Sequence, residues 1–273
     1  MAEIYGFDAY SPREIAQRVE TVGVAKARLP LLQLALLGLL AGAFIGLGAL
    51  GFVVVKSDPT LGYAAGQWLG GLVFSLGLLL VVVAGAELFT GNNLLAMAWA
   101  GGLISSTELL RNWLVVCLAN LAGAAGLALL VHLSGHAQLN GGAIGQTVLK
   151  IALAKQALPW QEALMRGVLC NLLVCMAVWM ALAGRSVVDK AVAIVFPISA
   201  FVAAGFEHSI ANMYLMPLAW LLQQSGLVPG QPVVSWAGML GNWLPVIAGN
   251  LLGGSVLVAL VYHLIYRRGR HDD

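Results

Sequence analysis

Charged side chains are scarce in this chain. Of its 273 residues, 10% are charged and 60% are hydrophobic, whereas a soluble domain carries about 25% charged residues. This composition excludes a soluble globular protein, and a net charge of +2 without a basic stripe excludes a nucleic-acid partner. The long apolar runs instead predict an all-α integral membrane protein surrounded by the lipid bilayer.

Residues suited to metal or covalent chemistry are also few. Cys117, Cys170 and Cys175 lie in apolar runs without a CxxC motif, which is typical of small buried residues. His132 and His136 have the spacing of ligands on a helix but lack an acidic partner nearby. Because Gly-x-Ser-x-Gly elements are missing too, we expect no enzyme, no metal and no cofactor.

Six apolar stretches are long enough to cross a bilayer. They cover residues 29–55, 66–101, 113–131, 167–184, 191–223 and 241–266. Six crossings place both termini on one side, and ten of the fourteen Lys and Arg residues flank the spans on that side. The positive-inside rule therefore predicts a multi-pass inner-membrane protein with cytoplasmic termini. The opposite face holds Lys56, Lys150, Lys155 and Arg166.

The two halves of the chain share a pattern. Gly-x-Glu-x4-Asn occurs at Glu87 with Asn92 and again at Glu207 with Asn212, 120 residues later. An Asn-Trp pair and a following asparagine also repeat, at an offset of 130: 112–113 matches 242–243, and Asn120 matches Asn250. With three spans in each half, the pattern predicts an inverted repeat. Its predicted parts are the first repeat at 29–136, a periplasmic linker at 137–162 and the second repeat at 163–266.

The remaining segments are polar. Residues 1–28 are charged and amphipathic, which predicts a cytoplasmic helix and no signal peptide. Ser11 and Glu14 have the spacing of a capping box at its start. A short helix is expected at 144–154 within the linker, and 267–273 form a cytoplasmic tail.

The two glutamates predict breaks in the second and fifth membrane helices. Gly, Asn and Thr follow Glu87 inside an apolar run, and unwound backbone is tolerated in lipid only where it lines a cavity or is buried in protein. A helix that restarts after a break exposes N–H groups that attract anions. We expect Glu87 and Glu207 to turn away from the pore and, with Asn92 and Asn212, to hold the breaks through hydrogen bonds from backbone amides or a neighbouring polar group. A protonated carrier role is the alternative.

Three polar residues are candidates for the pore itself. His208 lies inside a span and at a break, and an imidazole changes its charge near neutral pH. Thr90 precedes the helix restart and has a hydroxyl that can hold His208 or an anion. Asn171 lies near the middle of the fourth span. The alternatives are that His208 only braces the break and that Asn171, Asn120 and Asn250 only join helices.

Apolar residues flank this polar centre. Phe74, Leu78, Phe201, Leu88 and Phe89 would make dewetting constrictions above and below it, although ordinary packing explains any one of them.

The sequence around both breaks resembles the formate/nitrite transporter family. Residues 85–92, Gly-Ala-Glu-Leu-Phe-Thr-Gly-Asn, are similar to its first signature, and residues 206–213, Phe-Glu-His-Ser-Ile-Ala-Asn-Met, are very close to its second. Phe7-Asp8, Gly184-Arg185-Ser186 and Gly249-Asn250 extend the similarity over nearly the whole chain. The resemblance implies an aquaporin-like fold, a homopentamer with one pore per subunit, and transport of small monovalent anions with proton coupling under acidic conditions.

The resemblance also implies roles for individual residues. The family's central histidine falls on His208, its partner threonine on Thr90, its pore asparagine on Asn171 and its outer-vestibule lysine on Lys155. The outer constriction falls on Phe74, Leu78 and Phe201, and the inner one on Leu88 and Phe89.

The cargo is less defined than the family. Glu87 with Thr90-Gly91, and residues 152–155, resemble nitrite channels, while Phe7-Asp8 and residues 185–190 resemble formate channels. We expect formate first and nitrite next, with a proton donated by His208. The alternatives are a nitrite or hydrosulfide channel and an aquaporin-like channel for neutral solutes, although two matched Asn-Pro-Ala motifs are absent.

Overall fold

The computed structural model describes residues 8–229 and 232–266, and within them the chain is helical apart from one β-bridge between Ala9 and Gly184. Phe7 and the predicted tail at 267–273 lie outside the described residues.

Five continuous helical segments in the described part of the chain are long and apolar enough to cross a membrane. Their charged residues lie only in the first two turns or at the last residue, and the remainder is rich in Leu, Val, Ala and Gly, which is what a lipid environment requires. They are α2 (Leu31–Lys56), α3 (Tyr63–Leu79) with the π-helix η1 (Leu80–Gly85), α5 (Ser106–Leu133), α7 (Trp160–Ala181), and α10 (Trp236–Leu251) with the π-helix η5 (Leu252–Leu260) and α11 (Val261–Tyr266).

Two apolar stretches are interrupted at the glutamates of the repeated pattern, the one that begins with α3 and a further one. After η1 ends at Gly85, the chain resumes as a 3₁₀ turn, η2 (Gly91–Leu94), and then α4 (Leu95–Ala100). The second interruption separates α8 (Val187–Ala203) from α9 (Ser209–Gln224). Gly85 and Gly205 have φ angles of 87° and 71°. The left-handed backbone explains why each glutamate is preceded, two positions earlier, by a glycine.

The predicted helices at 11–28 and 144–154 are present as α1 (Pro12–Ala27) and α6 (Ala143–Gln156). The Ser11 hydroxyl and the Glu14 carboxylate form the expected reciprocal capping box at the start of α1. Two short 3₁₀ turns, η3 (His136–Gln138) and η4 (Asn140–Gly142), connect α5 to α6.

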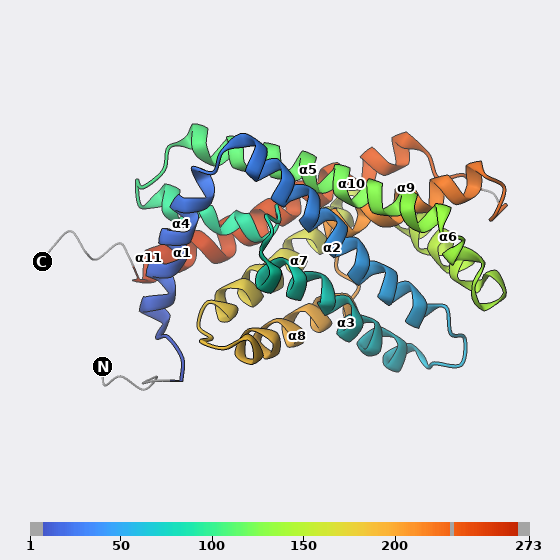
Figure 1. The fold of residues 1–273 in the computed structure, drawn as a ribbon, viewed down its shortest axis with the longest axis horizontal. Helices are drawn as coiled ribbons and strands as arrows, with labels where there is room; N and C mark the ends of the chain where they lie inside the picture. The colour runs from blue at the N-terminus through green and yellow to red at the C-terminus, as the bar shows by residue number, and fades with distance from the viewer. Residues whose placement is uncertain (1–7, 230–231, 267–273) are drawn as a thin grey trace, which may run out of the picture.

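The helices form an elongated bundle with α1, α4 and α11 at one end and α6 at the other (Figure 1). Within it, α2 packs along α5 and α7 along α10. Glycines allow this approach: a β-carbon at Gly42 or Gly123 would meet the backbone of the facing helix in the first pair, and one at Gly167 or Gly249 would do so in the second. Such contacts replace the hydrophobic effect, which does not join helices in lipid.

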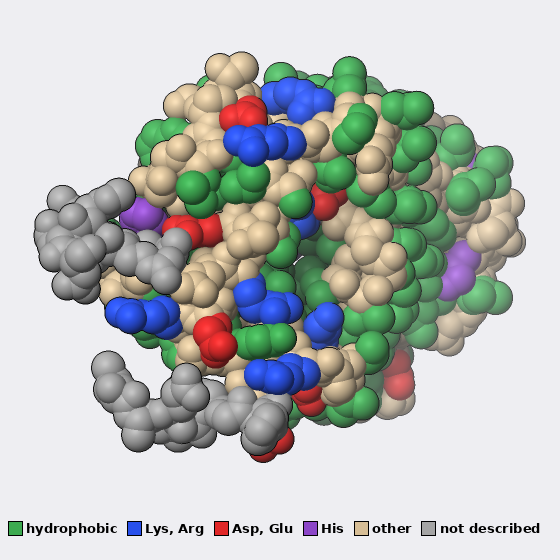
Figure 2. Space-filling model, turned by 60° about the vertical axis from the view of Figure 1, so that its left-hand side comes forward, with side chains coloured by type: hydrophobic (Ala, Val, Ile, Leu, Met, Phe, Trp, Pro, Cys, Tyr) green, Lys and Arg blue, Asp and Glu red, His purple; other side chains and the backbone are tan. Residues whose placement is uncertain are grey.

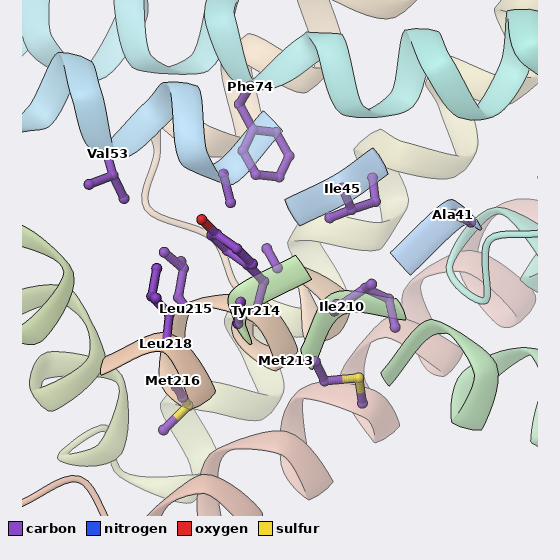
Figure 3. Close-up of a cluster of buried hydrophobic side chains, with 14 of the residues drawn as sticks. Ala41, Ile45, Val53, Phe74, Ile210, Met213, Tyr214, Leu215, Met216 and Leu218 are labelled. Carbon is purple, nitrogen blue, oxygen red and sulfur yellow. The ribbon is translucent and has the colours of Figure 1, made fainter. Parts of the chain in front are cut away.

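The core lies where α9 meets α2. Tyr214 and Ile210 of α9 are buried against Ile45 of α2, with Phe74 of α3 beside them (Figure 3). Twelve of the sixteen residues of α9 are buried, so this half-length helix is surrounded by protein and its first turn is fixed in the middle of the bundle.

Candidate functional site

Two cavities approach this centre, one lined by α1 and the other by α6, which lie at opposite ends of the bundle (Figure 1). The Glu87 cavity has a volume of about 240 Å³, and its lining includes Lys26, Leu78, Glu87, Leu88 and Asn92. The Glu207 cavity has a volume of about 310 Å³, and its lining includes Lys56, Phe74, Lys155, Arg166, Phe201, Glu207, His208 and Asn212.

The carboxylate of the Glu87 cavity is paired with a lysine from α1. Lys26 Nζ lies 2.9 Å from Glu87 Oε1, and Asn92 Nδ2 donates to Oε2 at 2.7 Å. The same Asn92 amide reaches Asn112 Oδ1 at 2.9 Å, and Asn112 donates back to the Lys26 carbonyl at 3.1 Å. The glutamate is 5% exposed, so the closed network provides the compensation that a buried charge requires. This end of the molecule is hollowed, with Lys and Arg side chains around the hollow (Figure 2).

The second break repeats this network with residues from α6, α9 and α10. Lys155 Nζ lies 2.8 Å from Glu207 Oε1, and Asn212 Nδ2 donates to Oε2 at 2.6 Å. Asn212 also reaches Asn242 Oδ1 at 2.7 Å, and Asn242 donates to the Lys155 carbonyl at 3.1 Å. The correspondence therefore includes α1 and α6, which the predicted repeat boundaries at 29–136 and 163–266 leave out.

Asn120 and Asn250 hold the unwound backbone at each break. Asn120 Nδ2 donates to the Gly38 and Glu87 carbonyls at 2.7 and 2.9 Å, and its Oδ1 accepts from the Phe89 N–H at 2.9 Å. Asn250 does the same with the Gly167 and Glu207 carbonyls and the Ser209 N–H. Each asparagine thus satisfies two backbone groups at the interruption and ties them to a carbonyl of a neighbouring continuous helix. Their role is more specific than the expected one of joining helices.

The expected orientation of the two glutamates is wrong. Glu87 and Glu207 line the cavities rather than turning away from them. Each carboxylate is bound by a lysine and an asparagine side chain. The expected donors were backbone amides or a neighbouring polar group, and the structure has the second. Sequence reasoning missed the lysine partners, using Lys26 only to assign orientation. The available signal was that Lys26 and Lys155 lie 129 residues apart, close to the offset of the asparagines.

His208, which lines the Glu207 cavity, meets Thr90, which lines neither cavity. His208 Nε2 lies 3.1 Å from Thr90 Oγ1, and both residues are buried. The Ala211 N–H donates to His208 Nδ1 at 3.2 Å, so the imidazole is the N-cap of α9. A neutral ring whose Nδ1 accepts a hydrogen bond carries its hydrogen on Nε2. That hydrogen is donated to Thr90 Oγ1, which leaves the threonine's own hydrogen available to a third group.

Aromatic rings enclose His208 on the side of the Glu207 cavity. Phe201 stacks on the imidazole with centroids 5.9 Å apart, and Phe74 meets Phe201 edge-on at 5.6 Å. Leu78, which was expected beside these rings, instead lines the Glu87 cavity together with Leu88. Two leucines therefore line the Glu87 cavity, and two phenylalanines line the Glu207 cavity together with His208.

Phe89 and Asn171 have a different position. Neither is among the residues that line the two cavities, and both are buried. Asn171 Nδ2 donates to the Thr90 carbonyl at 3.2 Å and to Asn250 O and Asn93 Oδ1 at 2.7 Å. Asn171 thus links the first break to α7 and to the carbonyl of Asn250, the asparagine that holds the second break. Within residues 8–229 and 232–266, no group of three or more His, Cys, Asp or Glu side chains is arranged to hold a metal ion.

A family model described as "Formate/nitrite transporter" matches residues 13–264. The chain belongs to the formate/nitrite transporter family. It is 38% identical to the formate channel FocA of Escherichia coli strain K12 over 96% of both chains. It is also 36% identical to the formate channel FocB of that strain, over 93% of both chains.

Solved structures of formate/nitrite transporters have the same fold. A pentameric formate channel with formate bound matches with a TM-score of 0.80 and 37% identity, over 86% of this chain and 97% of that one. An FNT family ion channel matches with a TM-score of 0.83 and 31% identity, over 92% and 98%. The protein is thus a membrane-spanning channel or transporter of this family and not an enzyme, as predicted.

Proposed function

We propose that the protein conducts small monovalent anions together with protons, formate first and nitrite next, through a pore in each subunit of a homopentamer. The observation that carries this proposal is the buried His208–Thr90 pair, together with two cavities that each have their own Lys–Glu pair. The relatives FocA and FocB are formate channels, and a matching solved structure is a pentamer that holds formate.

The proposed topology is an aquaporin-like inverted repeat of six crossings. The interrupted helices α3–η1 with η2–α4, and α8 with α9, are the second and fifth crossings. The matched networks of Glu87 and Glu207 support this arrangement, because they come from opposite ends of the bundle (Figure 1). We place both termini in the cytoplasm and the protein in the inner membrane, so that the Glu87 cavity faces inward. Residues 29–136 and 163–266 are then the two transmembrane repeats.

The apolar residues near the His208–Thr90 pair favour a cargo that crosses without a charge. An anion passing between Leu78 and Leu88, or between Phe74 and Phe201, loses its water and gains no compensating charge. A weak acid avoids this cost by crossing as the neutral acid. Formate and nitrite both become neutral by taking up one proton, and this is why we propose that protons accompany the cargo.

His208 is the group proposed to supply that proton. The neutral ring holds its only hydrogen on Nε2, so it must first become an imidazolium by binding a proton at Nδ1. Nδ1 is the atom that accepts from the Ala211 N–H. Proton uptake therefore breaks the cap of α9. Transfer from Nε2 to an oxygen of the anion, directly or through the Thr90 hydroxyl, gives the neutral acid and a neutral ring whose hydrogen is on Nδ1. The cap forms again only after that hydrogen has left Nδ1 and Nε2 has taken up a proton.

A His208→Asn variant separates the two roles of the residue. The Asn oxygen can accept from the first turn of α9 as imidazole does, but the side chain does not titrate. In proteoliposomes, we expect formate uptake by this variant to lose the pH dependence of the wild type. An unchanged pH profile would refute the proton role. Stopped-flow swelling with glycerol and with formate tests the neutral-solute alternative on the same vesicles.

A further inference from the structure

The two cavities differ in charge. The Glu87 cavity is lined by one lysine and one glutamate. The Glu207 cavity is lined by three cations, Lys56, Lys155 and Arg166, and by one glutamate. Lys155 is paired with Glu207 at 2.8 Å, and Arg166 is paired with Glu162 of the preceding helical turn at 2.8 Å.

Lys56 has no such partner. It is the last residue of α2, and among the described residues no carboxylate oxygen lies within 4 Å of its ammonium group. The acid closest in the sequence, Asp58, accepts from the Thr60 N–H and hydroxyl at 2.8 and 2.7 Å. These bonds lower the pKa of Asp58, led by the one from the hydroxyl, so this carboxylate is ionised but directed to Thr60.

The packing around Lys56 holds its ammonium over the start of α3. Nζ lies 5.8 Å from the ring centroid of Tyr63, and a β-carbon at Gly66 would lie only 3.5 Å from it. The ring attracts the cation, and Gly66 lies beside it at van der Waals distance. Lys56 is half-buried and lines the cavity, and it forms no ion pair with a described carboxylate.

We infer that Lys56 captures the permeating anion in the Glu207 cavity before the anion reaches Lys155 and His208. The inference rests on the proposed function, and the ligand is the same small monovalent anion. A lysine with a carboxylate 2.8 Å away presents a dipole, whose potential decays faster with distance than that of a single charge. Lys56 presents a single charge. It therefore raises the local anion concentration that the inner part of the cavity receives.

The test is the initial rate of formate uptake into proteoliposomes at subsaturating concentration and low ionic strength. Lys56→Gln is expected to lower this rate about threefold at 10 mM salt and to match the wild type at 0.5 M salt, because salt screens a solvent-reached charge. The rate at saturating formate should stay unchanged. Lys56→Arg, which keeps the charge, should retain wild-type uptake.

Lys150→Gln is the matched control. Lys150 lies on α6, as Lys155 does, but it is exposed and absent from the cavity lining, so the same loss of charge should leave uptake unchanged. Equal rates for Lys56→Gln and the wild type at low salt, or an equal loss in Lys150→Gln, would overturn the inference. A wild-type protein that passes no formate would instead contradict the proposed function.

Discussion

The two helix breaks share a network of ion pairs and hydrogen bonds, but they differ in the residues that follow each glutamate. Both use a lysine, a glutamate and three asparagines in matching bonds at similar distances, and the first break adds a bond from Lys26 Nζ to Asn92 Oδ1 at 3.0 Å. At the residue after the glutamate, however, the first break has Leu88 and the second has His208. Two positions later the first has Thr90 and the second has Ile210. The duplicated part therefore holds the unwound backbone at each break, and the residues proposed for the pore chemistry are ones that the two halves do not share.

The breaks also restart differently. The second is followed at once by the 16-residue α9, which His208 caps. The first is followed by the four-residue η2, which has no side-chain cap. The His208 imidazole, which caps α9, thus contacts the hydroxyl of Thr90, which precedes the 3₁₀ turn η2. Each half of the chain contributes one residue of this pair.

The largest expected effect comes from removing one carboxylate charge. Glu207→Gln leaves the ammonium of Lys155, whose side chain is 16% exposed, without its counter-ion. A loss of about 3 to 5 kcal/mol is expected. Glu87→Gln should cost less, because Lys26 is 28% exposed and keeps a 3.0 Å bond to Asn92 Oδ1. Thermal unfolding of the purified protein in detergent measures the difference.

The control for that pair is the double variant Lys155→Met with Glu207→Gln, which removes both charges and should recover part of the stability. Equal losses for the two single glutamate variants would show that exposure of the lysine does not decide the cost.

The next largest effect concerns Thr90 and His208, which the two breaks do not share. Thr90→Val keeps the shape of the side chain but leaves the Nε2 hydrogen of His208 without an acceptor, at a cost of about 1 to 3 kcal/mol. We expect formate flux to fall about tenfold or more. Thr90→Ser, which keeps the hydroxyl, is expected to retain most of the flux. Similar flux in the valine and serine variants would exclude a role for the hydroxyl.

The smallest effect tests a difference between the hydrogen bonds of two matching tryptophans. Trp113 Nε1 donates to the Asn92 carbonyl at 2.9 Å, whereas the matching Trp243 Nε1 is buried without a partner. Trp113→Phe should lose the contribution of one hydrogen bond, about 1 kcal/mol, and Trp243→Phe should lose less. Melting temperatures of the two variants, measured side by side, give the order; a reversed order would contradict the assignment of these bonds.

The positions of the helices and of both breaks could be predicted from apolar length and from the Gly-x-Glu-x4-Asn pattern, because lipid leaves the backbone few choices. The meeting of His208 with Thr90 was also within reach, since each lies at a break. The lysine partners were not, because Lys26 and Lys155 lie on helices outside the apolar spans and only the folded arrangement brings them to the glutamates. Leu78 was grouped with Phe74 and Phe201, but it lines the opposite cavity.

The bonds of Asn120 and Asn250 have a mechanical consequence. Each side chain joins its break to a neighbouring long helix through three backbone contacts at once, so neither interruption can shift alone. The middle of the proposed pore is consequently held at a constant width. A change in its conductance is then expected at the two cavities, where Lys26 of α1 and Lys155 of α6 pair with the glutamates.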